Sequence, residues 1–376
     1  MVYLDNSATT KPSKKAVEYI NNALNNTWGN PSSLHSLGME AEMLVSDARK
    51  TVAKSIGAAD NEIIFTGSGT EANNTAIMSA FYKKSMGNKI ITTKIEHPSV
   101  LNTVKRLEDE GFEVVRLGID TDGKISLEEL EKNLDNRTVL VSIMLVNNEI
   151  GTVQPIAESS NLIKKLSPRA LFHCDAVQGY GKIPINVKTL GIDLLTASGH
   201  KIHGPKGIGF LYCKKGVTIR PFITGGGQER GMRSGTEPTP LIAGLMGAVE
   251  DMPDLKKQYE QTRELRDYAV NVFQNSGFVK INSPLDACPF ILNISVTGYR
   301  SETLLHFLET KGIYVSSGSA CAKGEQSYVL SALGLNKSHS DSALRLSFSR
   351  DNTKEDIDFT LEALKEAVSR LRRSNI

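Results

Sequence analysis

Between about residue 60 and residue 215, short apolar runs alternate with longer segments of helical pattern, and this alternation limits the folds open to the chain. Several runs are continuous in Val, Ile and Leu, as expected for strands that are covered on both faces. Strands separated by helices predict right-handed crossovers and an α/β fold with a mainly parallel sheet. The predicted strands span residues 62–66, 89–93, 113–117, 138–146, 170–174, 193–196 and 208–213.

Beyond residue 254 the pattern changes, which predicts a second, smaller α+β domain. A helix is expected to close the chain, because its apolar residues alternate steps of four and three and Thr353 and Asp356 resemble a capping box. We predict a large domain over residues 14–255 and a small domain made of residues 1–13 and 256–376. The other elements predicted for the small domain are helices at 254–276 and 302–311 and strands at 290–295 and 344–348.

The bulk composition gives no reason to expect nucleic acid or a membrane as a partner. The chain has 376 residues, with 44 Lys and Arg against 42 Asp and Glu, and no run of 18 apolar residues. The first residues do not form a basic region followed by an apolar stretch, so no secretory signal is expected. The four cysteines show neither a CxxC pair nor the spacing of a disulfide framework. We therefore expect a reduced, cytoplasmic protein.

A lysine and a distant cysteine indicate the chemistry. Lys201 ends the sequence Ser198-Gly199-His200-Lys201, just after the predicted strand at 193–196. A lysine amine condenses with an aldehyde, and a constrained glycine-containing turn favours this role over that of a solvated lysine. Cys321 follows a Gly/Ser loop, where a thiolate nucleophile could move; the alternative is a small buried apolar residue. Together they predict pyridoxal-phosphate (PLP) chemistry with a sulfur-accepting thiol.

Other residues fit this cofactor, although each has a plainer explanation. Gly69 and Thr70 open a helix whose N-terminus could bind a phosphate, or they form an ordinary strand-to-helix turn. Asp175 ends a strand, where it could pair with a pyridinium nitrogen or cap the next segment. His97 could stack on the ring, move a proton, or serve as a structural hydrogen-bonding group. No metal site is predicted, because adjacent strand residues point to opposite faces and no zinc-like spacing occurs.

With these motifs in one order, the chain resembles the cysteine desulfurases of the class V aminotransferase superfamily, PLP enzymes of fold type I. The resemblance covers nearly the whole chain and rests on several motifs. They are residues 3–10 (YLDNSATT), 69–71 (GTE), 96–99 (EHPS), 147–151 (NNEIG), 173–178 (HCDAVQ), 198–201 (SGHK), 225–230 (GGGQER), 233–236 (RSGT) and 319–321 (SAC).

The resemblance implies a role for each matching residue. Lys201 would bind the cofactor aldehyde, His97 would stack on the ring, and Asp175 would pair with the ring nitrogen. Gln178 would bond the phenolic oxygen. Thr236 would reach the phosphate in the other subunit, which implies a homodimer with shared sites. The remaining roles are the phosphate contacts of Gly69, Thr70, Ser198 and His200, the binding of the substrate carboxylate by Asn148 and Arg345, and sulfur acceptance by Cys321.

The implied reaction converts L-cysteine to L-alanine and leaves a persulfide on Cys321, which a sulfur-acceptor protein of iron–sulfur cluster assembly or tRNA thiolation would take. Only residues 322–326 separate Cys321 from the next predicted helix, a shorter segment than in members that serve scaffolds. The sequence therefore leaves the acceptor open. It also leaves three alternatives: a selenocysteine lyase, a transaminase, and a non-catalytic PLP-binding scaffold for sulfur transfer.

Overall fold

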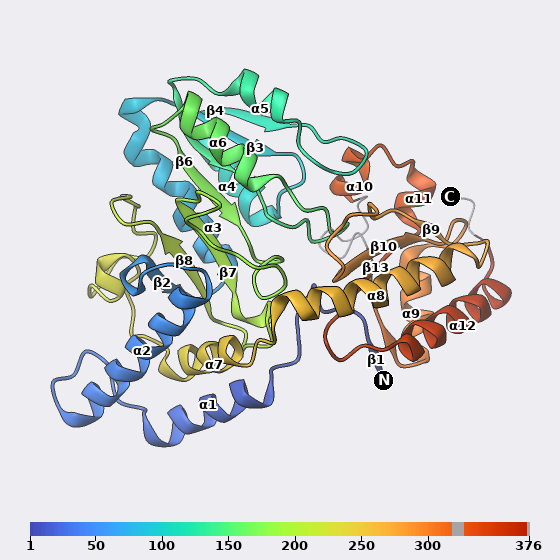
Figure 1. Ribbon diagram of the computed structural model, residues 1–376, viewed down its shortest axis with the longest axis horizontal. Helices are drawn as coiled ribbons and strands as arrows, with labels where there is room; N and C mark the ends of the chain where they lie inside the picture. Colours follow the sequence, from blue (N-terminus) through green and yellow to red (C-terminus); the bar gives the residue numbers. More distant parts are fainter. Residues whose placement is uncertain (318–326, 374–376) are drawn as a thin grey trace.

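The computed structural model describes residues 1–317 and 327–373, and its larger lobe is built on a seven-stranded sheet (Figure 1). The order across the sheet is β2-β8-β7-β6-β5-β3-β4. β8 is antiparallel to both of its neighbours, whereas the pairs from β7 to β4 are all parallel, which confirms the predicted mainly parallel α/β sheet. The strands are β2 (Ile63–Thr66), β3 (Lys89–Thr93), β4 (Glu113–Leu117), β5 (Thr138–Ser142), β6 (Leu171–Asp175), β7 (Leu194–Ser198) and β8 (Gly209–Cys213).

Helices cover both faces of this sheet, which explains the continuous apolar runs. Successive side chains of one strand enter opposite cores: Ile64 packs in one cluster, whereas Ile63 and Phe65 pack in the other. The Ile64 side carries α3 (Gly69–Met78) and α4 (Pro98–Asp109). The other side carries α1 (Lys14–Asn26), α2 (Ser36–Ser55), α5 (Leu127–Asn133), α6 (Ile156–Leu166) and α7 (Thr239–Glu250). Short 3₁₀ helices are η1 (Asp60–Glu62), η2 (Ser79–Met86), η3 (Gly199–Lys201) and η4 (Glu229–Gly231).

The smaller lobe has its own sheet and its own apolar core, as predicted (Figure 1). Its sheet has the order β12-β13-β10-β9 and is antiparallel. The predicted capping box of the last helix forms: Thr353 N–H donates to Asp356 and Asp356 N–H to Thr353. The elements are β9 (Lys280–Ile281), β10 (Ile291–Ser295), β12 (Ser316–Ser317), β13 (Ala343–Ser347), α8 (Leu255–Gln274), α9 (Ser301–Thr310), α10 (Tyr328–Ala332), α11 (Lys337–Asp341) and α12 (Lys354–Arg370).

The first residues of the chain belong to the smaller lobe's core. β1 (Val2–Tyr3) pairs in parallel with β11 (Ile313–Tyr314), and Val2 and Leu4 are buried in that core. The segment then runs towards the larger lobe, where Thr10 N–H donates to the carbonyl of His200 (2.8 Å). The domain boundaries at residues 13 and 255 stay a prediction. Within residues 1–317 and 327–373, no helix has the length and hydropathy needed to cross a membrane.

Candidate active site

A cavity of about 370 Å³ opens where the strands β2, β3, β6 and β7 end at the same edge of the large sheet. Residues that lie far apart in the sequence meet there because parallel strands place their carboxyl ends together. Two predicted site residues are not in its lining: Thr236 is exposed on the segment before α7, and Cys321 lies outside the described residues. The predicted residues that do line it are Gly69, Thr70, His97, Asn148, Asp175, Gln178, Ser198, His200, Lys201 and Arg345.

One end of the cavity suits an anion. Helix α3 begins there at Gly69, and the first backbone N–H groups of a helix have no intrahelical partner. A Cβ on Gly69 would lie 2.9 Å from Val177 Cγ2, so glycine lets the helix start approach the sheet closely. Ser198 Oγ is buried and has no hydrogen-bond partner among the described residues. These groups together offer unused donors to a phosphate.

Lys201 lies in the turn η3, directly after β7. Its Nζ donates to the backbone carbonyls of Ser7 and Ala8, at 2.8 Å for Ala8. Burial lowers the pKa of Lys201 to about 7; the positive charges of Lys182 and Arg345 act in the same direction, and Asp5 and Asp175 oppose them. At neutral pH a large fraction of the amine is therefore uncharged, as a nucleophile or a base must be.

Asp175 and Gln178 follow β6, and both side chains are held in place. Asp175 accepts hydrogen bonds from Val177 N–H (2.9 Å) and from Asn73 Nδ2 (2.7 Å). Gln178 Nε2 donates to the carbonyl of Ser7 (2.9 Å), while its Oε1 accepts from the buried Lys182 Nζ (2.9 Å). The bond to Ser7 uses one of the two N–H groups of the Gln178 amide, so the other can donate to a group bound in the cavity.

The two histidines of the site are neutral. His97 caps α4, and its Nδ1 accepts the N–H of Ser99 (3.1 Å). Burial lowers the pKa of His97, with Lys201 adding to the effect and Asp175 opposing it. Burial lowers the pKa of His200 to about 4, helped by Lys201 and Lys206. Neither ring therefore adds a positive charge to the cavity at neutral pH.

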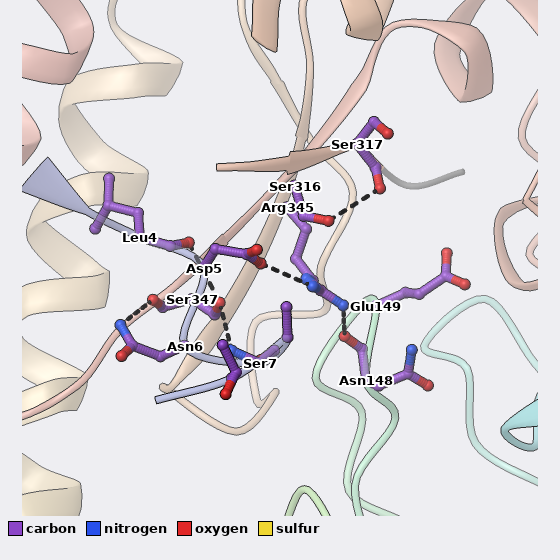
Figure 2. A network of polar contacts seen from close by, with 12 residues as sticks. Leu4, Asp5, Asn6, Ser7, Asn148, Glu149, Ser316, Ser317, Arg345 and Ser347 are labelled. Atoms are coloured by element: carbon purple, nitrogen blue, oxygen red, sulfur yellow. Dashed lines mark hydrogen bonds and ion pairs between the residues drawn. The ribbon is translucent and has the colours of Figure 1, made fainter. Parts of the chain in front are cut away.

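Arg345 on β13 of the smaller lobe lines the cavity, and its side chain lies between Asp5 and Asn148 (Figure 2). Its Nη2 contacts Asp5 Oδ1 (3.0 Å) and its Nη1 donates to the backbone carbonyl of Asn148 (3.0 Å). Arg345 Nε and Asn148 Oδ1 are buried without a hydrogen-bond partner in the described part of the chain. A buried guanidinium with an unused donor in the same cavity suits a substrate carboxylate.

Sequence reasoning missed five residues that complete the site. Ser7 and Ala8 lie in a motif used for the resemblance, but they act through backbone carbonyls, which leave no trace in residue type. Asn73 follows one of these motifs and Ser99 ends another, but the bond between their side chains forms only when α3 and α4 come together. Lys182 has no sequence signal that separates it from a solvated lysine.

The cavity fits pyridoxal 5′-phosphate. It joins unused donors at a helix N-terminus, a largely neutral lysine amine and a carboxylate at a strand end, which match the phosphate, the aldehyde and the ring nitrogen of that cofactor. The fold and the site thus define a pyridoxal-phosphate enzyme of fold type I.

Comparison with known proteins narrows this class. The model of the family described as aminotransferase class-V matches residues 2–359. A cysteine desulfurase from Nostoc sp. is 43% identical, over 99% of this chain and 94% of the relative. A solved NifS-like protein has a TM-score of 0.93 and 40% identity, over 98% of this chain and 100% of the other. A structure of SspA in complex with cysteine has a TM-score of 0.82 and 35% identity, over 93% of this chain and 99% of the other.

The chain belongs to the class-V aminotransferase family, and within it to the cysteine desulfurases. The resemblance read from the motifs is therefore confirmed, as is the cofactor, pyridoxal 5′-phosphate.

Proposed function

We propose that this chain converts L-cysteine to L-alanine, holds the released sulfur as a persulfide on Cys321, and passes it to an acceptor protein. The observation that carries the proposal is a single cavity with the largely neutral Lys201 on one side and the Arg345 fork on the other. An α-amino acid has an amine for the first side and a carboxylate for the second. The related SspA structure with bound cysteine supports cysteine as that amino acid.

The residues divide the work around the substrate. When bound, pyridoxal phosphate supplies an aldehyde for the substrate amine and a ring that withdraws electrons from Cα. Lys201 Nζ takes the Cα proton, because its lowered pKa leaves it uncharged near neutral pH. Asp175 would hold the ring nitrogen, and Gln178 would offer an N–H to the ring. Arg345 holds the carboxylate so that Cα stays within reach of Lys201.

Sulfur transfer needs a thiolate that reaches the substrate. Cys321 attacks the substrate sulfur, the new S–S bond forms as the Cβ–S bond breaks, and the electron pair of that bond remains with the carbon skeleton, which is protonated to alanine. No external oxidant is consumed. Ser316, five positions before Cys321 in the sequence, lines the cavity.

Mass spectrometry after incubation with L-cysteine tests this proposal. We expect the mass of one added sulfur atom on the peptide that contains Cys321. Cys321→Ser should still bind the cofactor and change its spectrum with L-cysteine, yet form no persulfide and sustain no sulfide release. Burial raises the pKa of the thiols of Cys174, Cys213 and Cys288, which makes them poor acceptors. Sulfur found on one of these three instead would contradict the assignment to Cys321.

The working unit is a homodimer in this proposal. Thr236, expected to contact a phosphate, is exposed and outside the cavity of its own chain. Large apolar side chains that are more than half exposed also cluster in one stretch from the end of α1 into α2, as a subunit interface would require. They are Leu24, Trp28, Leu34, Met39 and Met43.

Mixed dimers test the shared site. Subunits with Thr236→Val and subunits with Lys201→Ala should be inactive or weak alone, and light scattering should give twice the mass of the chain. After mixing and exchange, some heterodimers should regain activity, because one of their two sites is intact. Dimers that exchange fully without any recovery would show that Thr236 serves its own subunit.

The acceptor we propose is a cytoplasmic protein of iron–sulfur cluster assembly or tRNA thiolation. The free energy for transfer lies in the persulfide, so the acceptor needs only an accessible thiol. Incubating the persulfide form, made with labelled cysteine sulfur, with purified candidates should move the label to a cysteine of the true acceptor. A candidate that takes up no label faster than glutathione is not the acceptor.

A further inference from the structure

Four side chains form a hydrogen-bonded row along the ring-side wall of the cavity. Asp175 at the end of β6 accepts from Asn73 Nδ2 of α3 (2.7 Å), and the same nitrogen donates to Ser99 Oγ of α4 (2.8 Å). Ser99 Oγ lies 2.7 Å from His97 Nδ1. All four residues line the cavity, and Asn73 and Ser99 are buried. The row links the carboxylate expected at the cofactor ring to the histidine expected above it.

The hydrogens of this row have only one consistent arrangement. Asn73 must present its nitrogen to Asp175, because the opposite flip would bring its oxygen against a carboxylate. Both hydrogens of that nitrogen are then used, one on Asp175 and one on Ser99. The backbone N–H of Ser99 donates to His97 Nδ1 (3.1 Å), so this nitrogen carries no hydrogen. Ser99 Oγ lies 2.7 Å from the same nitrogen, so its own O–H is the donor of that bond.

We propose that Ser99, oriented by Asn73, is a positioning residue that holds His97 as a neutral imidazole with its hydrogen on Nε2. His97 then offers a hydrogen bond to the reacting system and has no free lone pair, so proton removal is left to Lys201. This division of work rests on the proposed function. The state of His97 itself does not, because the four contacts exist whatever the substrate.

The charges around His97 agree with this state. Burial and Lys201 disfavour the imidazolium, whereas Asp175 favours it, and the net effect lowers the pKa of His97. A hydrogen on Nδ1 would also point at the O–H and the N–H of Ser99, which are both donors to that nitrogen. Loss of the Ser99 hydroxyl removes one of these two donors, and a typical hydrogen bond corresponds to about one pKa unit.

NMR of the holoenzyme labelled with ¹⁵N-histidine tests the proposal, because the ¹⁵N shifts of His97 report which ring nitrogen carries a hydrogen and the pKa of the ring. The wild type should show His97 with hydrogen on Nε2 alone across neutral pH. Ser99→Ala should raise the pKa of His97 by about one unit, and Ser99→Thr, which keeps the hydroxyl, should restore the wild-type value. Asn73→Ala should shift it in the same direction, because the Ser99 hydroxyl is then free to turn away.

Thr103→Val is the matched control. Thr103 is also buried on α4, and its hydroxyl donates to the carbonyl of Ser99 (2.8 Å) outside the row, so its loss should leave the pKa of His97 unchanged. With L-cysteine, Ser99→Ala should lower kcat about tenfold and change KM by less than about twofold.

The two measurements separate the two hypotheses. If the wild type releases no alanine, the proposed function fails, and the NMR result still decides the state of His97. If the wild type is active but His97 in Ser99→Ala keeps the wild-type pKa and tautomer, the role of Ser99 is overturned. Hydrogen on Nδ1 in the wild type would overturn it as well.

Discussion

The two halves of the cavity are built differently. The half formed by the edge of the large sheet holds its groups in closed sets of bonds: Asp175 has two donors, and Gln178 has a partner on each end of its amide. The half formed by the smaller lobe holds Arg345 with one carboxylate and one backbone carbonyl, and its Nε has no partner among the residues that the structure describes. A substrate carboxylate can replace the Asp5 contact of Arg345, whereas Asp175 and Gln178 keep their partners within the chain.

The difference separates a fixed half from an exchangeable half. The fixed half suits a cofactor that stays through every turnover, because its groups need no rearrangement. The exchangeable half suits a substrate that enters and leaves, because Asp5 neutralises Arg345 while the site is empty of substrate. Changes in the first half should therefore act on the cofactor and on kcat, and changes in the second half on KM.

The largest effect is expected in the fixed half, from Lys201→Ala. Alanine release from cysteine should fall by about a thousandfold or more, because the base and the covalent link to the cofactor are both lost. The purified variant should also lose the yellow colour of a lysine-bound cofactor. Lys206→Ala, at an exposed lysine of the same loop, is the control and should keep both. Alanine release by Lys201→Ala at the wild-type rate would contradict its role.

A weaker effect is expected in the exchangeable half, from Arg345→Lys. The charge remains but the planar fork is lost, so KM for L-cysteine should rise about 30-fold while kcat falls less than about fivefold. The cofactor spectrum without substrate should stay as in the wild type. A change confined to kcat, with KM unaltered, would remove the distinction between the two halves.

The buried Lys182, which donates to Gln178, tests how much folding stability the fixed half costs. Burial lowers its pKa to about 8, below the usual 10.5, so between these values the folded chain binds fewer protons than the unfolded chain. The free energy of unfolding therefore rises with pH across this window. In the apo-protein, Lys182→Met should reduce the rise between pH 7 and pH 9.5 by about 2 kcal/mol in urea titrations. Lys188→Met, at an exposed lysine, should leave this rise unchanged. An equal rise in both variants would contradict the lowered pKa of Lys182.

The smallest effect is expected from Asp5→Asn. Asp5 competes with the substrate carboxylate for Arg345, so its neutral analogue should lower KM for L-cysteine by about threefold at neutral pH, with kcat little changed. The exposed Asp351→Asn should leave both constants as they are. A higher KM in Asp5→Asn would mean that Asp5 orients Arg345 rather than competing for it.

Sequence patterns predicted the large sheet well, because strands buried on both faces have a distinctive composition. The strands predicted at 89–93 and 113–117 have the bounds of β3 and β4. The strand predicted at 138–146 was too long, since β5 ends at Ser142. Met144 and Val146 are apolar because they line the cavity, and composition alone does not distinguish that burial from a strand.

For the site, sequence predicted the residues whose chemistry is visible in their type and missed those whose role depends on geometry. Gly69, Asp175 and Lys201 each follow a strand, so their meeting at one sheet edge could be expected. Asn73 and Ser99 meet only because α3 and α4 lie side by side on that sheet. The pairing of β1 with β11 joins segments with no shared local signal.

The pairing of β1 with β11 sets an order of events during synthesis of the chain. A ribosome delivers β1 first, yet Val2 has no partner until Ile313 has been made, a wait of about 15 to 60 s at ordinary elongation rates. Until then the segment that carries Ser7 and Ala8, whose carbonyls accept from Lys201, is not anchored through β1. A nascent chain can thus complete its large sheet while the segment beside its reactive amine still lacks this anchor.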